Sequence, residues 1–132
     1  MKISINGHEL DVSLAEDEAT RSSGLMNVES MPADKGMLFR WPEASPRSFW
    51  MKDTGLPLDI AFISSDGSII NIEKMVPFSL KSVLSTSPAS CALEVNSGWF
   101  EKHGVKAGDI VDGVFNFRKA ESGASERTPN GK

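Results

Sequence analysis

An apolar segment followed by a tight-turn dipeptide limits the folds open to this chain. Leu58–Ile63 is apolar on both faces, which is typical of a central strand covered from both sides. Asp66-Gly67 then turns the chain into Ile69–Val76, and this pattern predicts a β-hairpin. With a two-residue turn, Asp59 falls opposite Lys74. The register therefore predicts a charge partner for Asp59 across the hairpin.

A second hairpin is expected near the N-terminus. Asn6-Gly7 lies between alternating apolar and polar residues, so a strand pair should run from about Lys2 to Val12. A serine-rich stretch from Pro77 to Pro88 predicts a surface loop. Further strands are expected at Met37–Trp41 and Ser48–Met51, joined by a Pro42–Pro46 turn, and at Cys91–Val95 and Ile110–Phe117.

Two short helices complete the expected elements. Ser13-Leu14-Ala15-Glu16 reads as a capping box, which predicts a helix near Leu14–Ser23 with Gly24 as its stop. A second helix is expected from about Gly98 to His103, capped by Asn96 or Ser97.

These elements predict an α+β domain with a mainly antiparallel, strongly curved or barrel-like sheet and two short helices, because long helical crossovers are missing. The 132 residues suit one globular domain, expected over residues 1–117. Residues 118–132 offer little to bury, so a flexible C-terminal tail is expected there.

Charge and composition exclude several classes of partner. A net charge of −4 argues against a nucleic-acid binder, which needs a basic surface. No apolar stretch is long enough to span a membrane. The single cysteine, Cys91, permits no internal disulfide, and the start of the chain turns polar too soon for a signal peptide. A cytoplasmic protein with a small-molecule partner is expected, and the oligomeric state is left open.

Motifs for familiar chemistries are missing. The chain contains no Gly-x-Ser-x-Gly elbow and no glycine-rich phosphate loop. His8, His103 and Cys91 are too few and too scattered to predict a zinc site. The methionines have no repeat spacing that would indicate copper. No metal and no cofactor is therefore expected.

Two carboxylates in apolar strands are candidates for acid–base chemistry. Asp59 and Glu94 lie among apolar neighbours, and burial would raise their pKa values. The structural alternative pairs Asp59 with Lys74, and Glu94 with Arg21 or a backbone donor.

The run Phe49-Trp50-Met51-Lys52-Asp53-Thr54 places charges among bulky apolar side chains just before the central strand. If Phe49 and Met51 point inward, Trp50 points toward solvent, a second layer or a cleft. Arg21 could bind an anionic group or tie its helix to Asp59 or Glu94. The candidate ligand-binding residues are Arg21, Trp50, Met51, Lys52, Asp59 and Glu94.

Several short motifs occur in an order typical of one prokaryotic family. They are Arg21 with Gly24-Leu25-Met26, Gly36-Met37-Leu38-Phe39, Phe49-Trp50-Met51-Lys52, Pro57-Leu58-Asp59, Leu93-Glu94 and Gly108-Asp109. Over about Ile3 to Val114 the chain resembles the domain of unknown function 192 family, also called uncharacterised protein family 0127. The resemblance implies a compact domain with a curved, partly barrel-like sheet, and some exported relatives. Asp53 stands where that family often has Asn.

Three functions follow as hypotheses. The first is a small-ligand binding module with an aromatic and charged pocket. The second is a hydrolase-like enzyme with Asp59 or Glu94 as acid or base. The third is a structural or interaction domain whose polar residues fix the fold.

Overall fold

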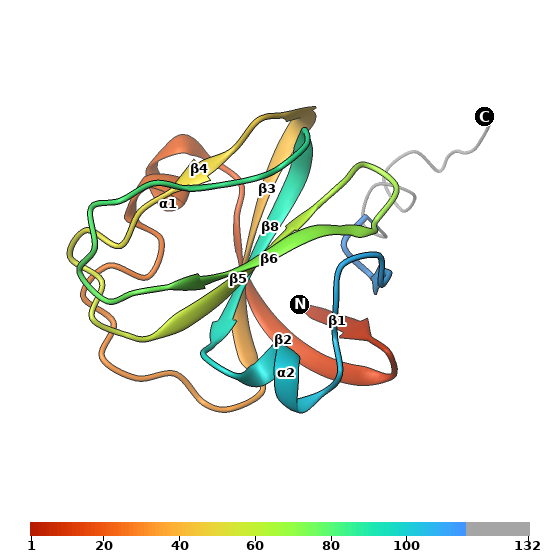
Figure 1. The fold of residues 1–132 in the computed structure, drawn as a ribbon, viewed down its shortest axis with the longest axis horizontal. Helices are drawn as coiled ribbons and strands as arrows, with labels where there is room; N and C mark the ends of the chain where they lie inside the picture. The colour runs from red at the N-terminus through yellow and green to blue at the C-terminus, as the bar shows by residue number, and fades with distance from the viewer. Residues whose placement is uncertain (116–132) are drawn as a thin grey trace.

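The computed structural model describes residues 1–115, and its main element is a strongly curled, seven-stranded half-barrel sheet (Figure 1). Its strand order is β6-β5-β8-β3-β2-β1-β9, antiparallel throughout except for the parallel pair β2–β3. The expected sheet is thus confirmed. The strands are β1 (Lys2–Ile5), β2 (His8–Ala15), β3 (Lys35–Ser45), β5 (Leu58–Ile63), β6 (Ile69–Met75), β8 (Ala89–Asn96) and β9 (Val111–Asp112).

The remaining elements flank this sheet. Strands β4 (Ser48–Phe49) and β7 (Val83–Leu84) form a separate two-stranded sheet. Figure 1 shows helix α1 (Glu18–Ser23) on the same side of the molecule as β4, and helix α2 (Trp99–Lys102) on the other. No helix within residues 1–115 is long and apolar enough to cross a bilayer.

Both faces of the curled sheet are buried, each by its own apolar cluster. One cluster contains Leu38, Leu93 and Val95 together with residues of β1, β2 and α2. The other contains Phe39 and Ile60 together with residues of the β4–β7 side. Every residue of β5 is buried, as its continuous apolar pattern predicts.

The two predicted hairpins are confirmed. Asn6 and Gly7 have φ values of 52° and 81°, the left-handed pair that a tight two-residue turn requires. In the second hairpin Asp59 pairs with Lys74, as the register predicts. The two side chains approach to 3.8 Å between Asp59 Oδ1 and Lys74 Nζ.

The start of the first helix differs from the prediction. Strand β2 continues to Ala15, because Leu14 and Ala15 pair with β3, and α1 begins only at Glu18. Asp17 caps the helix by accepting the Thr20 backbone N–H at 2.7 Å. The capping box was therefore a wrong interpretation, since sheet pairing takes its first residues. Gly24 does end the helix, with φ 46° and its N–H donated to the Thr20 carbonyl.

Several further expectations need correction. Strand β3 continues past Trp41 to Ser45, where a turn was expected. Ser48–Phe49 leaves the main sheet and pairs with β7, and β7 lies inside the expected surface loop. Helix α2 begins after Gly98, with no side-chain cap from Asn96 or Ser97. Up to residue 115 the last strand is Val111–Asp112, shorter than expected. Residues 116 and 117 of the expected final strand, and the predicted tail, lie outside the described residues.

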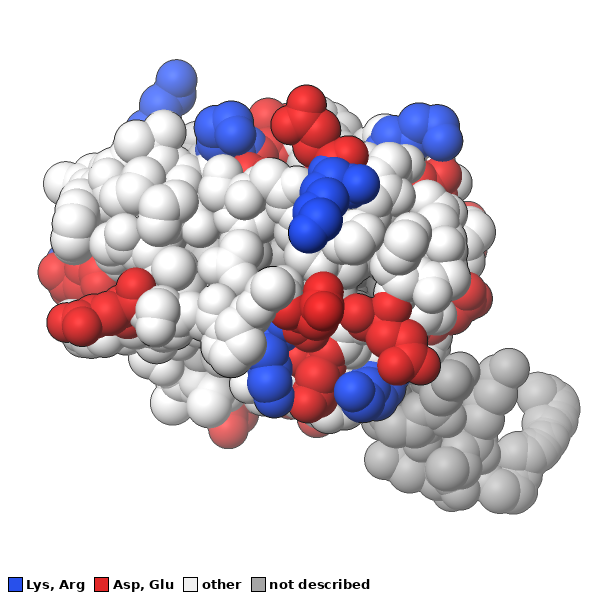
Figure 2. Space-filling model, turned by 90° about the horizontal axis from the view of Figure 1, so that it is seen from below, with Lys and Arg blue, Asp and Glu red and all other residues white. Residues whose placement is uncertain are grey.

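Charges of both signs share the molecular surface. Figure 2 shows Lys and Arg interspersed with Asp and Glu, beside a broad area without charged side chains. No single-sign basic face is visible from this direction.

Candidate functional site

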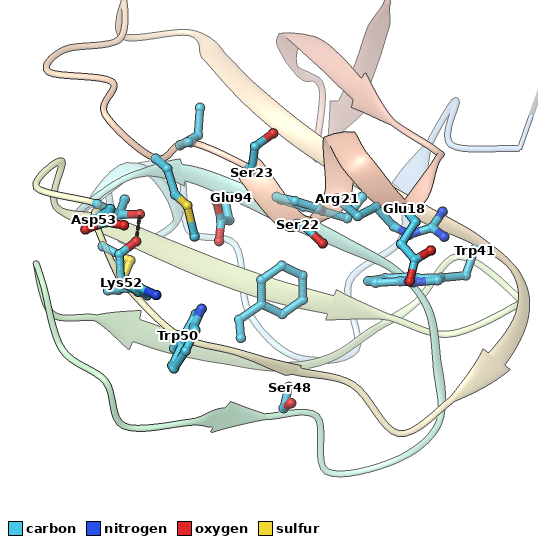
Figure 3. Close-up of a pocket in the computed structure, with 17 residues that line it drawn as sticks. Glu18, Arg21, Ser22, Ser23, Trp41, Ser48, Trp50, Lys52, Asp53 and Glu94 are labelled. Atoms are coloured by element: carbon cyan, nitrogen blue, oxygen red, sulfur yellow. Dashed lines mark hydrogen bonds between the residues drawn. The ribbon is translucent and has the colours of Figure 1, made fainter.

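A cavity of about 560 Å³ opens between α1 and the segment that connects β3 to β5. One wall consists of α1 and the residues that follow it, from Glu18 to Met26. The opposite wall is the stretch from Ser48 to Thr54, and strands β3 and β8 contribute Phe39, Trp41 and Glu94 (Figure 3). We call this space the Glu94 cavity.

Glu94 is the most unusual residue of the cavity. It lies on the central strand β8 with a relative exposure of 4%, and its carboxyl points into the space between α1 and the Trp50–Lys52 segment (Figure 3). Its neighbours across the sheet are Met37 and Ile60. Within residues 1–115 no hydrogen bond or ion pair reaches this carboxyl. A buried carboxyl without a partner is costly, and such groups concentrate at functional sites.

Burial raises the pKa of Glu94 to about 8. The physical cause is desolvation, which penalises the charged form. At neutral pH the side chain is therefore mostly a neutral acid, able both to donate and to accept a hydrogen bond. The sequence predicts this direction of shift.

Aromatic rings form much of the cavity wall. Phe49 is half-buried and packs edge-on against Phe39, with ring centroids 4.8 Å apart. Trp41 contacts Phe49 in the same way at 6.1 Å. Trp50 faces away from this cluster and is 48% exposed, although it lines the cavity. The alternation of Phe49, Trp50 and Met51 thus places Trp50 in a cleft, one of the positions expected for it.

Two cations of the lining are already engaged with aromatic rings. The Lys52 ammonium lies 5.6 Å from the centroid of the Trp50 ring. The Arg21 guanidinium lies 5.6 Å from Trp41. Arg21 Nη1 also donates to the carbonyl oxygens of Glu16 and Arg40, the latter at 3.0 Å. Arg21 does not pair with Asp59 or Glu94, the two carboxylate partners predicted for it.

A tight turn presents the Trp50–Lys52 wall. Thr54 donates its N–H to the Met51 carbonyl, and Met51 donates its own N–H to Ser79. Asp53 has φ 55°, a left-handed conformation that Asn and Asp adopt more readily than other residues with a side chain. The resemblance placed Asn here, and the backbone conformation suits either residue. Met51 is 2% exposed and anchors the turn in the core.

The structure brings together five of the six candidate residues. Those lining the cavity are Arg21, Trp50, Met51, Lys52 and Glu94. Asp59 lies elsewhere, because it precedes Ile60, which pairs with Glu94, and neighbouring residues of a strand point to opposite faces. Its Oδ2 accepts the Gly98 N–H at 2.9 Å, so Asp59 holds the start of α2.

Several lining residues were not selected from the sequence. Two of them are charged, Asp53 on the turn and Glu18 on α1. The others are the hydroxyl-bearing residues and the short segment after α1: Ser22, Ser23, Gly24, Leu25, Met26, Ser48 and Thr54. The Leu25-Met26 signal was present in the family motif, but only the fold shows that this segment faces the Trp50 turn.

Arg40 is a further buried charge that sequence reasoning missed. It is 3% exposed and pairs with Glu16 at 2.6 Å, while its Nη1 donates to the Val114 carbonyl at 2.9 Å. This ion pair lies at the junction of β2, β3 and the C-terminal segment. It accounts for the role of Glu16, which the capping-box interpretation had assigned to the helix.

A smaller cavity of about 410 Å³ adjoins the first through Met51. Its lining includes Glu73, Lys74, Lys81 and Leu84, and the nearby side chains Phe78 and Leu80 are largely exposed. Across residues 1–115 no cluster of three His, Cys, Asp or Glu side chains could hold a metal ion.

The comparison with protein families identifies relatives of this arrangement. Residues 1–113 match a family model described as DUF192, uncharacterized ACR, COG1430. The chain belongs to the DUF192 family. The comparison with curated proteins gives no match.

Two solved structures are similar to this DUF192 protein. A protein of Sinorhizobium meliloti 1021, described provisionally as a transcription regulator, is 42% identical with a TM-score of 0.82, and the match covers 85% of this chain and 92% of that one. A protein of unknown function from Novosphingobium aromaticivorans DSM 12444 is 30% identical with a TM-score of 0.82, covering 86% and 84%.

Proposed function

We propose that this DUF192 protein is a binding module that takes a small molecule into the Glu94 cavity. The observation that carries the proposal is the Glu94 carboxyl, buried and without a partner in the described part of the chain, at a cavity that also exposes the Trp50 ring. Such a carboxyl lacks the hydrogen bonds that a buried polar group needs, and a ligand could supply them.

The dimensions and chemistry of the cavity support this function. Its volume of about 560 Å³ lies within the range of small-molecule sites, roughly 300–1,000 Å³. Aromatic and thioether side chains provide an apolar surface, and a few polar groups converge on it. Known ligand sites combine the same two features, apolar area for affinity and a few polar groups for orientation.

The test is a thermal-shift screen of sugars, nucleotides, amino acids and peptides. A ligand should raise the Tm of the wild type, since binding to the folded state alone stabilises it. Trp50→Ala and Glu94→Gln should each reduce that shift strongly. Ile110→Ala is the control for Trp50→Ala, because Ile110 is also a large apolar side chain and is exposed to 49%. Glu101→Gln on α2 is the control for Glu94→Gln. Neither Ile110 nor Glu101 lines the cavity.

The controls should bind every hit as the wild type does. If no compound raises the Tm of the wild type more than that of Trp50→Ala, the cavity is not a ligand site and the proposal fails. Circular dichroism of each variant separates lost binding from lost folding.

A second candidate is an enzyme that uses Glu94 as a general acid. The raised pKa of this carboxyl favours it, because a proton donor that is still protonated at neutral pH suits acid catalysis. Asp59 no longer supports this candidate, since its carboxylate is held by Gly98 N–H and Lys74 away from the cavity. Conversion of a screening hit by the wild type, absent in Glu94→Gln, would favour the enzyme.

The structural hypothesis is weakened at one point. Arg21 was expected to pair with Asp59 or Glu94 in this case, whereas it donates to two backbone carbonyls. Arg21→Ala would therefore strand no carboxylate.

The proposal includes no nucleic acid and no membrane as partner. The Sinorhizobium relative is described as a regulator, but a net charge of −4 disfavours binding to phosphates, and the face seen in Figure 2 carries charges of both signs. Gel-shift assays at low salt should show no retardation of random duplex DNA.

A further inference from the structure

Glu94 lacks a counter-charge of its own. The charged residues that share its cavity are Glu18 and Arg21 on α1, and Lys52 and Asp53 on the turn. The strands on either side of β8 place only Met37 and Ile60 opposite Glu94. No ion pair within residues 1–115 joins Arg21 or Lys52 to Glu94, and burial alone accounts for its raised pKa. The ionised carboxyl would therefore have no cation beside it.

The aromatic walls already accept cations. The Lys52 ammonium lies over Trp50 at 5.6 Å, and the face of Trp41 carries the Arg47 guanidinium at 4.0 Å. Trp50 differs from Trp41 because it is half-exposed at the cavity, and within residues 1–115 the cation over its ring is the end of a flexible lysine chain. Its ring remains accessible to a positively charged group from outside.

The charge balance of the lining points the same way. With Glu94 ionised, the carboxylates of Glu18, Asp53 and Glu94 face the cations of Arg21 and Lys52, which leaves a formal charge of 2 − 3 = −1. One cationic nitrogen would neutralise it. An anion would instead add to the negative charge beside a carboxyl that is already hard to ionise.

We propose that the Glu94 cavity binds an organic cation, an amine or quaternary ammonium compound, whose charged nitrogen pairs with the Glu94 carboxylate and whose carbon atoms lie against Trp50 and Phe49. This inference rests on the proposed small-molecule function and names its ligand class. Binding ionises Glu94: its O–H bond breaks, the proton passes to solvent, and the ligand keeps its own charge. No other covalent bond changes.

Pairs of probes of equal shape test the charge requirement. Choline is compared with its uncharged isostere 3,3-dimethylbutan-1-ol, and cadaverine with 1,5-pentanediol, while butyrate serves as an anion. Isothermal titration calorimetry in two buffers of different ionisation enthalpy gives both the affinity and the number of protons released by the wild-type protein.

The cation of at least one pair should bind at least tenfold more tightly than its uncharged partner. Its affinity should rise about tenfold per pH unit between pH 6 and 7.5, because each unit ionises about ten times more of the free carboxyl. Close to one proton should be released per ligand bound in this range.

Three variants test the charge requirement independently of the probe pairs. Glu94→Gln should abolish the preference for the cation and the proton release, whereas Glu101→Gln should change neither. Lys52→Met should retain or strengthen cation binding, because it removes a like charge from the Trp50 ring.

Several results would overturn the inference. Uncharged probes that bind as tightly as the cations, without proton release, would leave the small-molecule function standing but refute its cationic ligand class. Binding of butyrate that Lys52→Met abolishes would identify an anion site instead. If none of the probes binds, the cation class is rejected, and the wider screen then decides whether the binding function itself survives.

Discussion

At the scale of single residues, the proposed function depends mainly on Glu94. Strand β8 is otherwise built from small and apolar side chains, and every residue from Ala89 to Val95 is buried. An apolar residue or an amide at position 94 would avoid the cost of desolvating a carboxyl. The sequence predicted the burial of Glu94 from its apolar neighbours. It did not predict that the carboxyl would face a cavity without a partner, because that depends on strands distant in sequence.

The pH dependence of stability should reveal this cost. The pKa of Glu94 is about 8 in the folded protein, against an ordinary value near 4.5 in the unfolded chain. Between these values the folded state holds a proton that the unfolded state has released, so raising the pH favours unfolding. The stabilisation is complete below pH 4.5 and is lost as the pH rises toward 8.

Replacing Glu94 with Gln removes this dependence. From pH 5 to pH 8 the free energy of unfolding of Glu94→Gln should improve relative to the wild type by about 2–4 kcal/mol, since one pKa unit corresponds to about 1.4 kcal/mol. Urea denaturation at several pH values measures it. The test compares how the free energy of unfolding changes with pH in the two proteins. The cost of burying the uncharged amide is the same at every pH, so it cancels from this comparison. Parallel pH profiles for the two proteins would show that Glu94 is not desolvated.

At the scale of secondary-structure elements, local signals predicted well and non-local pairings did not. The hairpins at Asn6-Gly7 and Asp66-Gly67 were correct because turn dipeptides and alternation act within a few residues. The start of α1 was wrong because β3, about twenty residues away, competes for Leu14 and Ala15. The departure of β4 to β7 likewise depends on a partner over thirty residues downstream.

The same limit explains the error at Asp59. The sequence placed Asp59 and Glu94 in apolar strands but could not show that Ile60 lies opposite Glu94, which sets Asp59 on the other face. The run from Phe49 to Thr54 was selected as a candidate because its residue types alone are unusual, and it lines the Glu94 cavity. Which residues line the cavity was thus predictable where residue type decides it, and not where strand register does.

Asp59 should therefore affect stability without affecting the cavity. Asp59→Ala removes the acceptor of the Gly98 N–H and the partner of Lys74, which should lower the free energy of unfolding by about 1–3 kcal/mol. Asp59→Asn keeps an acceptor for Gly98 and should lose less. Ligand affinity, measured by calorimetry, should match the wild type in both variants. A tenfold loss of affinity in Asp59→Asn would place Asp59 in the site after all.

At the scale of the whole molecule, the curled sheet separates a closed apolar core from the side that holds the Glu94 cavity. One face packs against β1, β2 and α2 and forms a closed apolar core. The other face packs against the β4–β7 side, and there the cavity lies between α1 and the Trp50 turn beside Glu94 (Figure 3). Glu94 thus lies on β8, a central strand of the half-barrel that pairs with β3 on one side and with β5 on the other.

The most direct test of the central claim is a titration of the Glu94 carboxyl carbon by ¹³C NMR in the ligand-free protein. A desolvated carboxyl without a counter-charge should titrate with a midpoint near 8, far above the ordinary glutamate value of 4.5. A midpoint near 4.5 would mean that Glu94 is hydrated or paired, and the proposed binding site would lose its physical basis.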